Sequence, residues 1–296
     1  MIVRLAEHSG FCFGVRRAIQ MALDARAKGL RVCTIGELIH NPQIVLELAE
    51  KGIRSCGDAS GIHDSTVIVR SHGITKQEME ILRKNGNSII DATCPYVKRT
   101  QELVQEMSAL SYPVMILGDA DHPEVIGMLS YGDEKTRVVK AENKIDTVFR
   151  QKLCLVSQTT QKLSNLQELV ARLLPTTQEL RVFNTICLAT SQRQEAVLKL
   201  AKASDLMIIV GGRNSSNTRM LHRLCSDICP SIHVETEAEL NEQNTTGFHR
   251  IGISAGASTP AQTIVNVFNI IKKINGEPAD AETRIEDIPL FKEESC

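Results

Sequence analysis

Residues 91–97 read Asp-Ala-Thr-Cys-Pro-Tyr-Val, and they place Cys94 where a strand is expected to end and a helix to begin. The short apolar run Ser88-Ile89-Ile90 precedes this stretch, and apolar residues at helical spacing follow it. Pro95 suits the first helical turn, because proline lacks the N–H that would have no partner there. The helix dipole favours the thiolate form of a cysteine at this position. Cys94 is therefore a candidate metal ligand or nucleophile.

The same arrangement occurs three times along the chain. A strand-like run leads to Cys12 and another leads to Cys187, and a helical pattern follows each of them. The three cysteines are 82 and 93 residues apart. The glycines that end the next apolar runs, Gly36, Gly118 and Gly211, keep the same spacing. This repeat predicts three related lobes.

Each repeat continues as short strands that alternate with helices, which predicts mostly parallel sheets with right-handed crossovers. Each repeat closes with a strand, a polar loop and a helix, and the closing helices are expected at 76–85, 162–174 and 261–274. The sequence therefore predicts an α/β protein of three similar lobes with mostly parallel sheets. Three equivalent cysteines, one per lobe, most simply meet on a pseudo-threefold axis, around a central metal ion or metal cluster. The expected boundaries are 13–93 for lobe 1, with the Cys12 segment joining the central site, 94–186 for lobe 2, 187–276 for lobe 3, and 277–296 for a mobile, acidic tail.

The composition is that of an ordinary globular protein. Of 296 residues, 42% are apolar, 23% are charged and 3% are aromatic, and the net charge is −1. This balance gives no electrostatic reason to expect nucleic acid or a membrane surface as a partner. No apolar run approaches the length of a spanning helix, and the chain enters a strand at its start. A cytoplasmic location is expected.

Nine cysteines are an odd number, and nothing favours a disulfide framework. Cys33 and Cys154 lie in apolar strands and are expected in the core. Cys225 and Cys229 share a helical face and could hold metal, but core packing is the favoured interpretation. Three cysteines that follow the repeat could instead hold zinc with an open position, or three irons of a 4Fe–4S cubane. Thiolate ligands suit both metals, so spacing alone does not choose between them.

Polar side chains gather in the loops that should meet the carboxyl ends of the strands, where parallel sheets bind ligands. They are His40, His72, His122, Glu124, Thr159, Thr160, Ser215, Ser216, Asn217 and Ser258. Imidazole, hydroxyl and amide donors at helix N-termini suit a phosphate or diphosphate. No Walker A or GxGxxG pattern is present, so a nucleotide is not indicated. Glu124 could deliver a proton, although a first-turn glutamate is also favoured by the helix dipole alone.

Six ordered motifs resemble those of the 4-hydroxy-3-methylbut-2-enyl diphosphate reductases, and the similarity runs over residues 1–275. The motifs are Gly10-Phe11-Cys12, Ala92-Thr93-Cys94-Pro95, His122-Pro123-Glu124-Val125, Ser157-Gln158-Thr159-Thr160, Asn214-Ser215-Ser216-Asn217 and Ala255-Gly256-Ala257-Ser258. Asp119 stands where the family often has histidine, and the tail after Gly276 has no counterpart in the resemblance.

The resemblance implies an oxidoreductase that carries a 4Fe–4S cluster on Cys12, Cys94 and Cys187, with one iron open to the substrate. Two electrons, from ferredoxin or flavodoxin, and two protons would remove the allylic hydroxyl as water. The products would be isopentenyl and dimethylallyl diphosphates, at the last step of the methylerythritol phosphate route. The implied diphosphate ligands are His40, His72, Ser215, Asn217 and Ser258, with Ser216 beside them. Glu124 would be the proton source, Thr159 would orient the hydroxyl, and His122 would assist.

Two other readings stay open on the residues alone. A zinc hydrolase acting on a phosphorylated small molecule could use the same three thiolates with a bound water. A non-catalytic iron–sulfur sensor could use the cluster, although it has little need of so many phosphate-compatible side chains. Colour distinguishes the zinc hydrolase from an iron–sulfur protein, because a zinc protein is colourless and a protein with a cubane cluster is brown.

Overall fold

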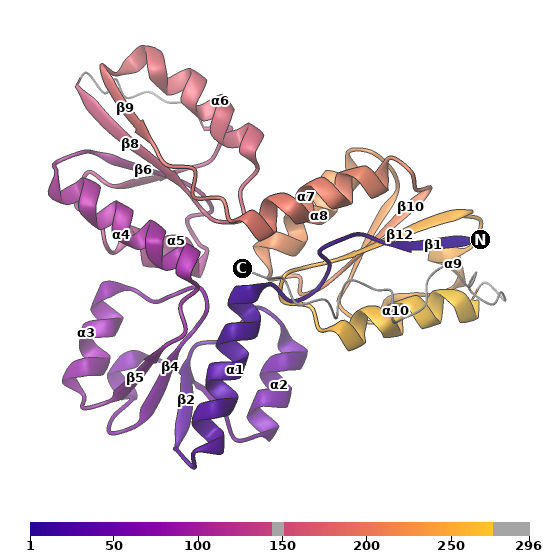
Figure 1. The fold of residues 1–296 in the computed structure, drawn as a ribbon, viewed down its shortest axis with the longest axis horizontal. Helices are drawn as coiled ribbons and strands as arrows, with labels where there is room; N and C mark the ends of the chain where they lie inside the picture. Colours follow the sequence, from indigo (N-terminus) through magenta and orange to yellow (C-terminus); the bar gives the residue numbers. More distant parts are fainter. Residues whose placement is uncertain (144–150, 275–296) are drawn as a thin grey trace. The chain divides into compact units, whose positions relative to one another are not determined.

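The computed structural model describes residues 1–143 and 151–274, and these residues contain three four-stranded sheets in which every strand pair is parallel (Figure 1). The predicted tail at 277–296 lies outside the described residues. The chain forms two compact units. The first contains Met1–Arg16, His40–Ile44 and the chain from Leu188, and the second contains Arg17–Ile39 and Val45–Cys187.

The second unit holds two sheets of equivalent strand order. The first sheet has the order β3-β2-β4-β5, and the second has the order β7-β6-β8-β9. Their strands are β2 (Val32–Ile35), β3 (Arg54–Cys56), β4 (Thr66–Val69), β5 (Ser88–Asp91), β6 (Val114–Leu117), β7 (Arg137–Val139), β8 (Lys152–Ser157) and β9 (Glu179–Val182). The helices are α1 (Phe13–Ala27) and α2 (Pro42–Glu50), which begin in the first unit, and α3 (Lys76–Lys84), α4 (Pro95–Ala109), α5 (Pro123–Leu129) and α6 (Leu163–Leu173).

The sheet of the first unit has the order β1-β12-β10-β11. Its elements are β1 (Ile2–Leu5), β10 (Leu206–Val210), β11 (Ser231–Val234), β12 (Arg250–Ala255), α7 (Leu188–Ala201), α8 (Ser216–Ser226), α9 (Glu242–Thr245) and α10 (Ala261–Ile274). Figure 1 shows α10 on one face of this sheet and α7 and α8 on the other. The central strand β10 is a continuous apolar run, because helices cover both faces of the sheet.

The N-terminal strand completes the sheet of the last repeat. Val3 and Leu5 of β1 pair in parallel with Ile251 and Ile253 of β12, from the other end of the chain. The strand that precedes each cysteine thus occupies the same edge position: β5 before Cys94, β9 before Cys187 and β1 before Cys12. The sequence predicted the strand at residues 2–6 but did not assign it to a sheet, although the repeat contains that information.

The closing helices confirm the predicted ones to within one residue at each end, since they span Lys76–Lys84, Leu163–Leu173 and Ala261–Ile274. The core cysteines are also confirmed. Cys154 packs in the core between β6 and α4, and Cys225 is fully buried with Cys229 packed against its cluster. Among the described residues, no helix combines the length and apolar character needed to cross a membrane.

The place of β1 in the last sheet can be tested with a pair of aspartate variants. Val3 is 9% exposed and belongs to the core cluster that α10 covers, whereas its neighbour Arg4 is exposed. We expect Val3→Asp to lower the free energy of unfolding by on the order of 3 kcal/mol, because it buries a carboxyl group without a partner. Urea unfolding followed by circular dichroism measures the midpoint. Arg4→Asp is the control, and equal midpoints for the two variants would contradict the pairing.

Candidate active site

Each of the three repeated cysteines stands directly before a helix. Cys12 precedes α1, Cys187 precedes α7, and Cys94 is the N-cap residue of α4 with Pro95 in the first turn. All three are half-buried and outside any disulfide. Burial raises the pKa of three core cysteines, Cys33, Cys154 and Cys225, to about 12, so these thiols stay protonated.

The backbone N–H of each cysteine is held by a neighbouring loop. In the second unit, Cys94 N–H donates to the Ser71 carbonyl at 2.9 Å, and Cys187 N–H donates to the Thr159 carbonyl at 3.1 Å. In the first unit, Cys12 N–H donates to the Ala257 carbonyl at 3.0 Å. Each cysteine therefore lies next to a loop that carries a predicted binding residue: His72, Thr159 or Ser258.

Glu124 and Thr159 form a buried pair in the second unit. Glu124 is 2% exposed and lies in the first turn of α5. Its Oε1 accepts from the Thr159 N–H at 2.7 Å, and its Oε2 accepts from Thr159 Oγ1 at 3.0 Å. His122 is the N-cap residue of α5, and its Nδ1 accepts from the Glu124 N–H at 3.2 Å. Both oxygens of the carboxyl group are thus fixed by one threonine.

Burial raises the pKa of Glu124 from 4.5 to about 7, and the two hydrogen bonds from Thr159 oppose this rise. Desolvation is the larger effect, because a charged carboxylate loses its hydration in the interior. The group therefore holds a proton on a substantial fraction of molecules at neutral pH. That property suits a general acid, whose pKa should lie near the working pH.

The predicted residues of the second unit form one connected set. The rings of His72 and His122 meet edge to face, with 5.5 Å between their centroids. His72 follows Ser71, which holds Cys94, and His122 caps the helix that carries Glu124. Thr159, the partner of Glu124, holds Cys187. These residues therefore contact one another within this unit, and their joint function stays a prediction from the sequence.

The remaining predicted residues form a second set in the first unit. Ser215 is the N-cap residue of α8, and its Oγ accepts from Thr218 N–H at 3.3 Å, while Ser216 begins the helix. Asn217 is 5% exposed, and its Nδ2 donor has no hydrogen-bond partner among the described residues. Ser258 Oγ donates to the His40 carbonyl at 3.0 Å.

The loops of this second set are packed against each other without spare room. A Cβ atom on Gly212 would lie 2.9 Å from the His40 carbonyl oxygen, so only glycine allows the loop before α8 to approach His40 this closely. His40, Ser258 and the start of α8 thus share one region of the first unit. The sequence predicted this grouping from the positions of the loops at the carboxyl ends of strands.

Gln158 is a residue whose role the sequence analysis did not recognise, although it lies in the quoted 157–160 motif. Its side chain is fully buried beside Thr159, and its Oε1 accepts from the Asp119 N–H at 3.1 Å. It therefore ties the Thr159 loop to the start of the loop that carries His122 and Glu124. The available signal in the sequence was that Gln158, an amide residue, directly follows a strand in the same lobe as the loop that begins at Asp119.

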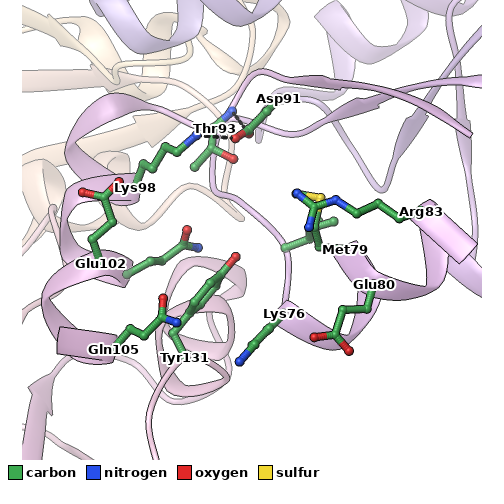
Figure 2. Close-up of a pocket in the computed structure, with 12 residues that line it drawn as sticks. Lys76, Met79, Glu80, Arg83, Asp91, Thr93, Lys98, Glu102, Gln105 and Tyr131 are labelled. Atoms are coloured by element: carbon green, nitrogen blue, oxygen red, sulfur yellow. Dashed lines mark hydrogen bonds and ion pairs between the residues drawn. The ribbon is translucent and has the colours of Figure 1, made fainter. Parts of the chain in front are cut away.

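A separate cavity of about 300 Å³ lies in the second unit between α3 and α4 (Figure 2). Lys76 and Arg83 reach into it from α3, opposite Glu102 of α4 and the ring of Tyr131. Its lining mixes charges of both signs and contains none of the predicted site residues. The cavity is therefore not the predicted active site.

The raised pKa of Glu124 has a measurable consequence for stability. A folded pKa near 7 against an unfolded value of 4.5 stabilises the fold fully below pH 4.5, and this contribution is lost as the pH rises to about 7. We expect the unfolding free energy of the parent, minus that of Glu124→Gln, to fall by about 1.4 kcal/mol per pH unit within this window. Urea unfolding of both proteins at several pH values measures the difference, and a flat difference would contradict the burial argument.

Comparison with known proteins identifies the family. A family model described as LytB protein matches residues 3–272. A 4-hydroxy-3-methylbut-2-enyl diphosphate reductase from Trichlorobacter lovleyi is 44% identical over 277 residues, which are 93% of this chain and 99% of that protein. The protein of the same name from Caldanaerobacter subterraneus is 41% identical over 284 residues, which are 94% of this chain and 99% of that protein.

Two solved structures agree with this result. The structure of an (E)-4-hydroxy-3-methyl-but-2-enyl diphosphate reductase, described as the terminal enzyme of the non-mevalonate pathway, is 40% identical with a TM-score of 0.67. The match covers 93% of this chain and all of that one. The reductase structure from Plasmodium falciparum is 28% identical with a TM-score of 0.85, and the match covers 98% of this chain and 95% of that one. The resemblance seen in the sequence and the three-lobed α/β fold class are confirmed, and the chain belongs to the LytB protein family.

Proposed function

We propose that this chain is a reductase that removes the hydroxyl group of (E)-4-hydroxy-3-methylbut-2-enyl diphosphate. Two electrons and two protons enter, the allylic C–O bond breaks, water leaves, and isopentenyl and dimethylallyl diphosphates form. The observation that carries the proposal is the buried Glu124, with a pKa of about 7 and both carboxyl oxygens held by Thr159. Such a group can supply a proton to a leaving hydroxyl at neutral pH.

The three repeated cysteines fit a thiolate-bound 4Fe–4S cluster. The fit rests on the donor set: three half-buried thiols outside disulfides, each directly before a helix, while the other buried cysteines stay protonated in the core. Cys12, Cys94 and Cys187 would hold the cluster. When bound, a cluster with one unligated iron supplies electrons and a Lewis-acidic position that side chains lack.

Thr159 would connect the acid to the substrate. Its Oγ1 donates to Glu124 Oε2 when the carboxyl group is ionised. When Glu124 is protonated, the same bond can reverse, so that Glu124 donates to Thr159 and the Thr159 proton turns to the substrate hydroxyl. His122, through its Nδ1 bond to the Glu124 N–H, would keep the first turn of α5 in place.

The α8 set would bind the diphosphate group. The buried Nδ2 of Asn217 is a donor that lacks a partner among the described residues, and such a group is costly to bury unless a ligand completes it. Ser215, Ser216 and Ser258 add hydroxyl groups beside the N-terminus of α8, where the helix dipole favours an anion. His40 and His72 would add imidazole donors.

The proposal includes the lobe boundaries and the redox partner. Lobes at 13–93, 94–186 and 187–276 would surround the cluster, with residues 277–296 as a tail. A one-electron protein, ferredoxin or flavodoxin, would deliver the two electrons in turn, because an iron–sulfur centre accepts electrons singly. A cytoplasmic location stays a prediction from the sequence.

Replacement of the acid tests the proton donor. We expect Glu124→Gln to lower anaerobic turnover of the hydroxylated diphosphate by about 10²- to 10⁴-fold, since an amide cannot supply the proton. Substrate loss and product formation are measured with a strong chemical reductant. Asp121→Asn is the control, because Asp121 is an exposed acid in the same loop. Turnover of Glu124→Gln near that of the parent would rule out the proposed proton donor.

Replacement of a cysteine tests the cluster. Cys94→Ser should lose the brown colour and the acid-labile sulfide of the anaerobically reconstituted chain, because serine is a poor ligand for a thiolate site. Cys56→Ser, a half-buried cysteine in β3, should keep both. Iron and sulfide analysis gives the result. A colourless parent that contains zinc would contradict the cluster and favour a hydrolase.

A further inference from the structure

Arg193 is a buried cation that has no ionic partner among the described residues. Its side chain is 2% exposed, Nη1 donates to the Ala189 carbonyl at 2.9 Å, and Nη2 donates to the Gly10 carbonyl at 2.8 Å. Within residues 1–143 and 151–274, Nε has no hydrogen-bond partner and no carboxylate forms an ion pair with the Arg193 side chain. Arg250, in contrast, is exposed and paired with Asp205.

A cation in this position is expensive for the fold. Arginine keeps its charge when buried, and moving it out of water is strongly unfavourable unless an anion or a full set of acceptors replaces the water. Two carbonyl groups satisfy only part of the guanidinium group. The burial of Arg193 therefore indicates a role that depends on its charge. Its two hydrogen-bond acceptors, the Ala189 and Gly10 carbonyls, indicate which segments that role involves.

The residues that Arg193 joins belong to two of the cysteine segments. Gly10 lies two residues before Cys12, and α7, which carries Arg193, begins directly after Cys187. The long-range bond from Arg193 to Gly10 therefore fixes the loop in front of Cys12 to the first two turns of α7. All of these contacts lie within the first unit.

Arg17 makes the equivalent contact in the second unit. It lies on α1, which begins directly after Cys12, and donates to the carbonyls of Thr93 at 3.2 Å and Asp91 at 3.4 Å. Thr93 is the residue before Cys94. Arg17 is half-buried, and it too has no ion pair with a described carboxylate. In both cases an arginine on the helix after one cysteine holds the loop in front of another.

The helix that follows Cys94, α4, also carries an arginine near its start, but this residue makes different contacts and serves as a matched control. Arg99 lies five residues after Cys94, as Arg17 does after Cys12. Its side chain is 56% exposed and pairs with Glu102 and Glu106 of the same helix. Among the described residues, Arg99 makes no hydrogen bond to a cysteine loop. Its charge is neutralised by the two glutamates and is also exposed to solvent.

We propose that Arg193 and Arg17 are positioning residues for the cysteine loops, and that their unpaired positive charges make the thiolate-bound centre easier to reduce. The inference rests on the proposed function. Reduction adds one negative charge to a centre already bound by thiolates, and a nearby desolvated cation stabilises that added charge. The bonds to Gly10 and Thr93 meanwhile hold the backbone of each ligand in place, as outer hydrogen bonds do at other metal sites.

Anaerobic reconstitution of Arg193→Met tests both parts. We expect its cluster to be lost about tenfold more readily to a chelator than the parent cluster, because the Cys12 loop has lost its anchor. We expect its midpoint potential, from a redox titration followed by electron paramagnetic resonance, to shift to a more negative value. Arg193→Lys keeps the charge but cannot bind both carbonyls, so its potential should lie nearer the parent's while its chelator sensitivity stays raised.

Arg17→Met should change both quantities in the same directions by a smaller amount, because Arg17 is only half-buried, and Arg99→Met should change neither. Hydrogen–deuterium exchange of the peptide that contains Gly10 and Cys12 should accelerate in Arg193→Met. If Arg193→Met did not fold, as judged by circular dichroism, Arg193→Lys and Arg17→Met would carry the test.

The possible failures are distinguishable. A parent chain that takes up no cluster would overturn the proposed function and this inference with it. A parent that holds a cluster, with arginine variants that match it in chelator sensitivity and in midpoint potential, would overturn the inference alone. Equal shifts in Arg99→Met and Arg17→Met would show a general charge effect and would also overturn it.

Discussion

The parallel direction of every strand pair is the constraint on which the rest of this protein depends. In a parallel sheet all strands end at one edge, and each loop that leaves this edge meets the N-terminus of a helix. The fourth strand of each sheet, β5, β9 or β1, leads from that edge to a cysteine and then to α4, α7 or α1. The polar residues follow the same rule, because they lie in loops after β2, β4, β6, β8, β10 and β12. One topological rule thus brings the thiols and the polar side chains to equivalent edges.

Burial gives Glu124 and Arg193 properties that they would not have in water. Glu124 loses its hydration and gains only the two bonds from Thr159, so its carboxyl group holds a proton near neutral pH. Arg193 loses its hydration as well but cannot lose its proton, so a full positive charge stays in the interior. An acid that retains its proton, and a cation that has no counter-ion among the described residues, are both properties that the proposed reduction would use where negative charge develops.

Much of this organisation could be predicted from the sequence, because the repeat is visible in it. Cys12, Cys94 and Cys187 are separated by the same intervals as the glycines that follow them, and this repeat predicts the alternation of strands and helices. The closing helices were located to within one residue. The loop residues could be grouped as well, since strand-end loops gather at one edge. The family resemblance supplied the assigned roles.

Other features could not be predicted, because they depend on contacts between residues far apart in the chain. The bond from Arg193 to Gly10 joins residues 183 positions apart, and an arginine in a helix is expected from sequence alone to lie on the surface. The raised pKa of Glu124 depends on the degree of burial, which a motif alone does not give.

The central claim is that thiols from three distant segments bind one iron–sulfur centre with a position left for the substrate. The Mössbauer spectrum of the chain reconstituted with ⁵⁷Fe tests this claim most directly. The account predicts a 4Fe–4S spectrum in which one iron differs from the other three and responds to the addition of substrate. A spectrum of four equivalent irons unaffected by substrate, or no bound iron at all, would contradict it.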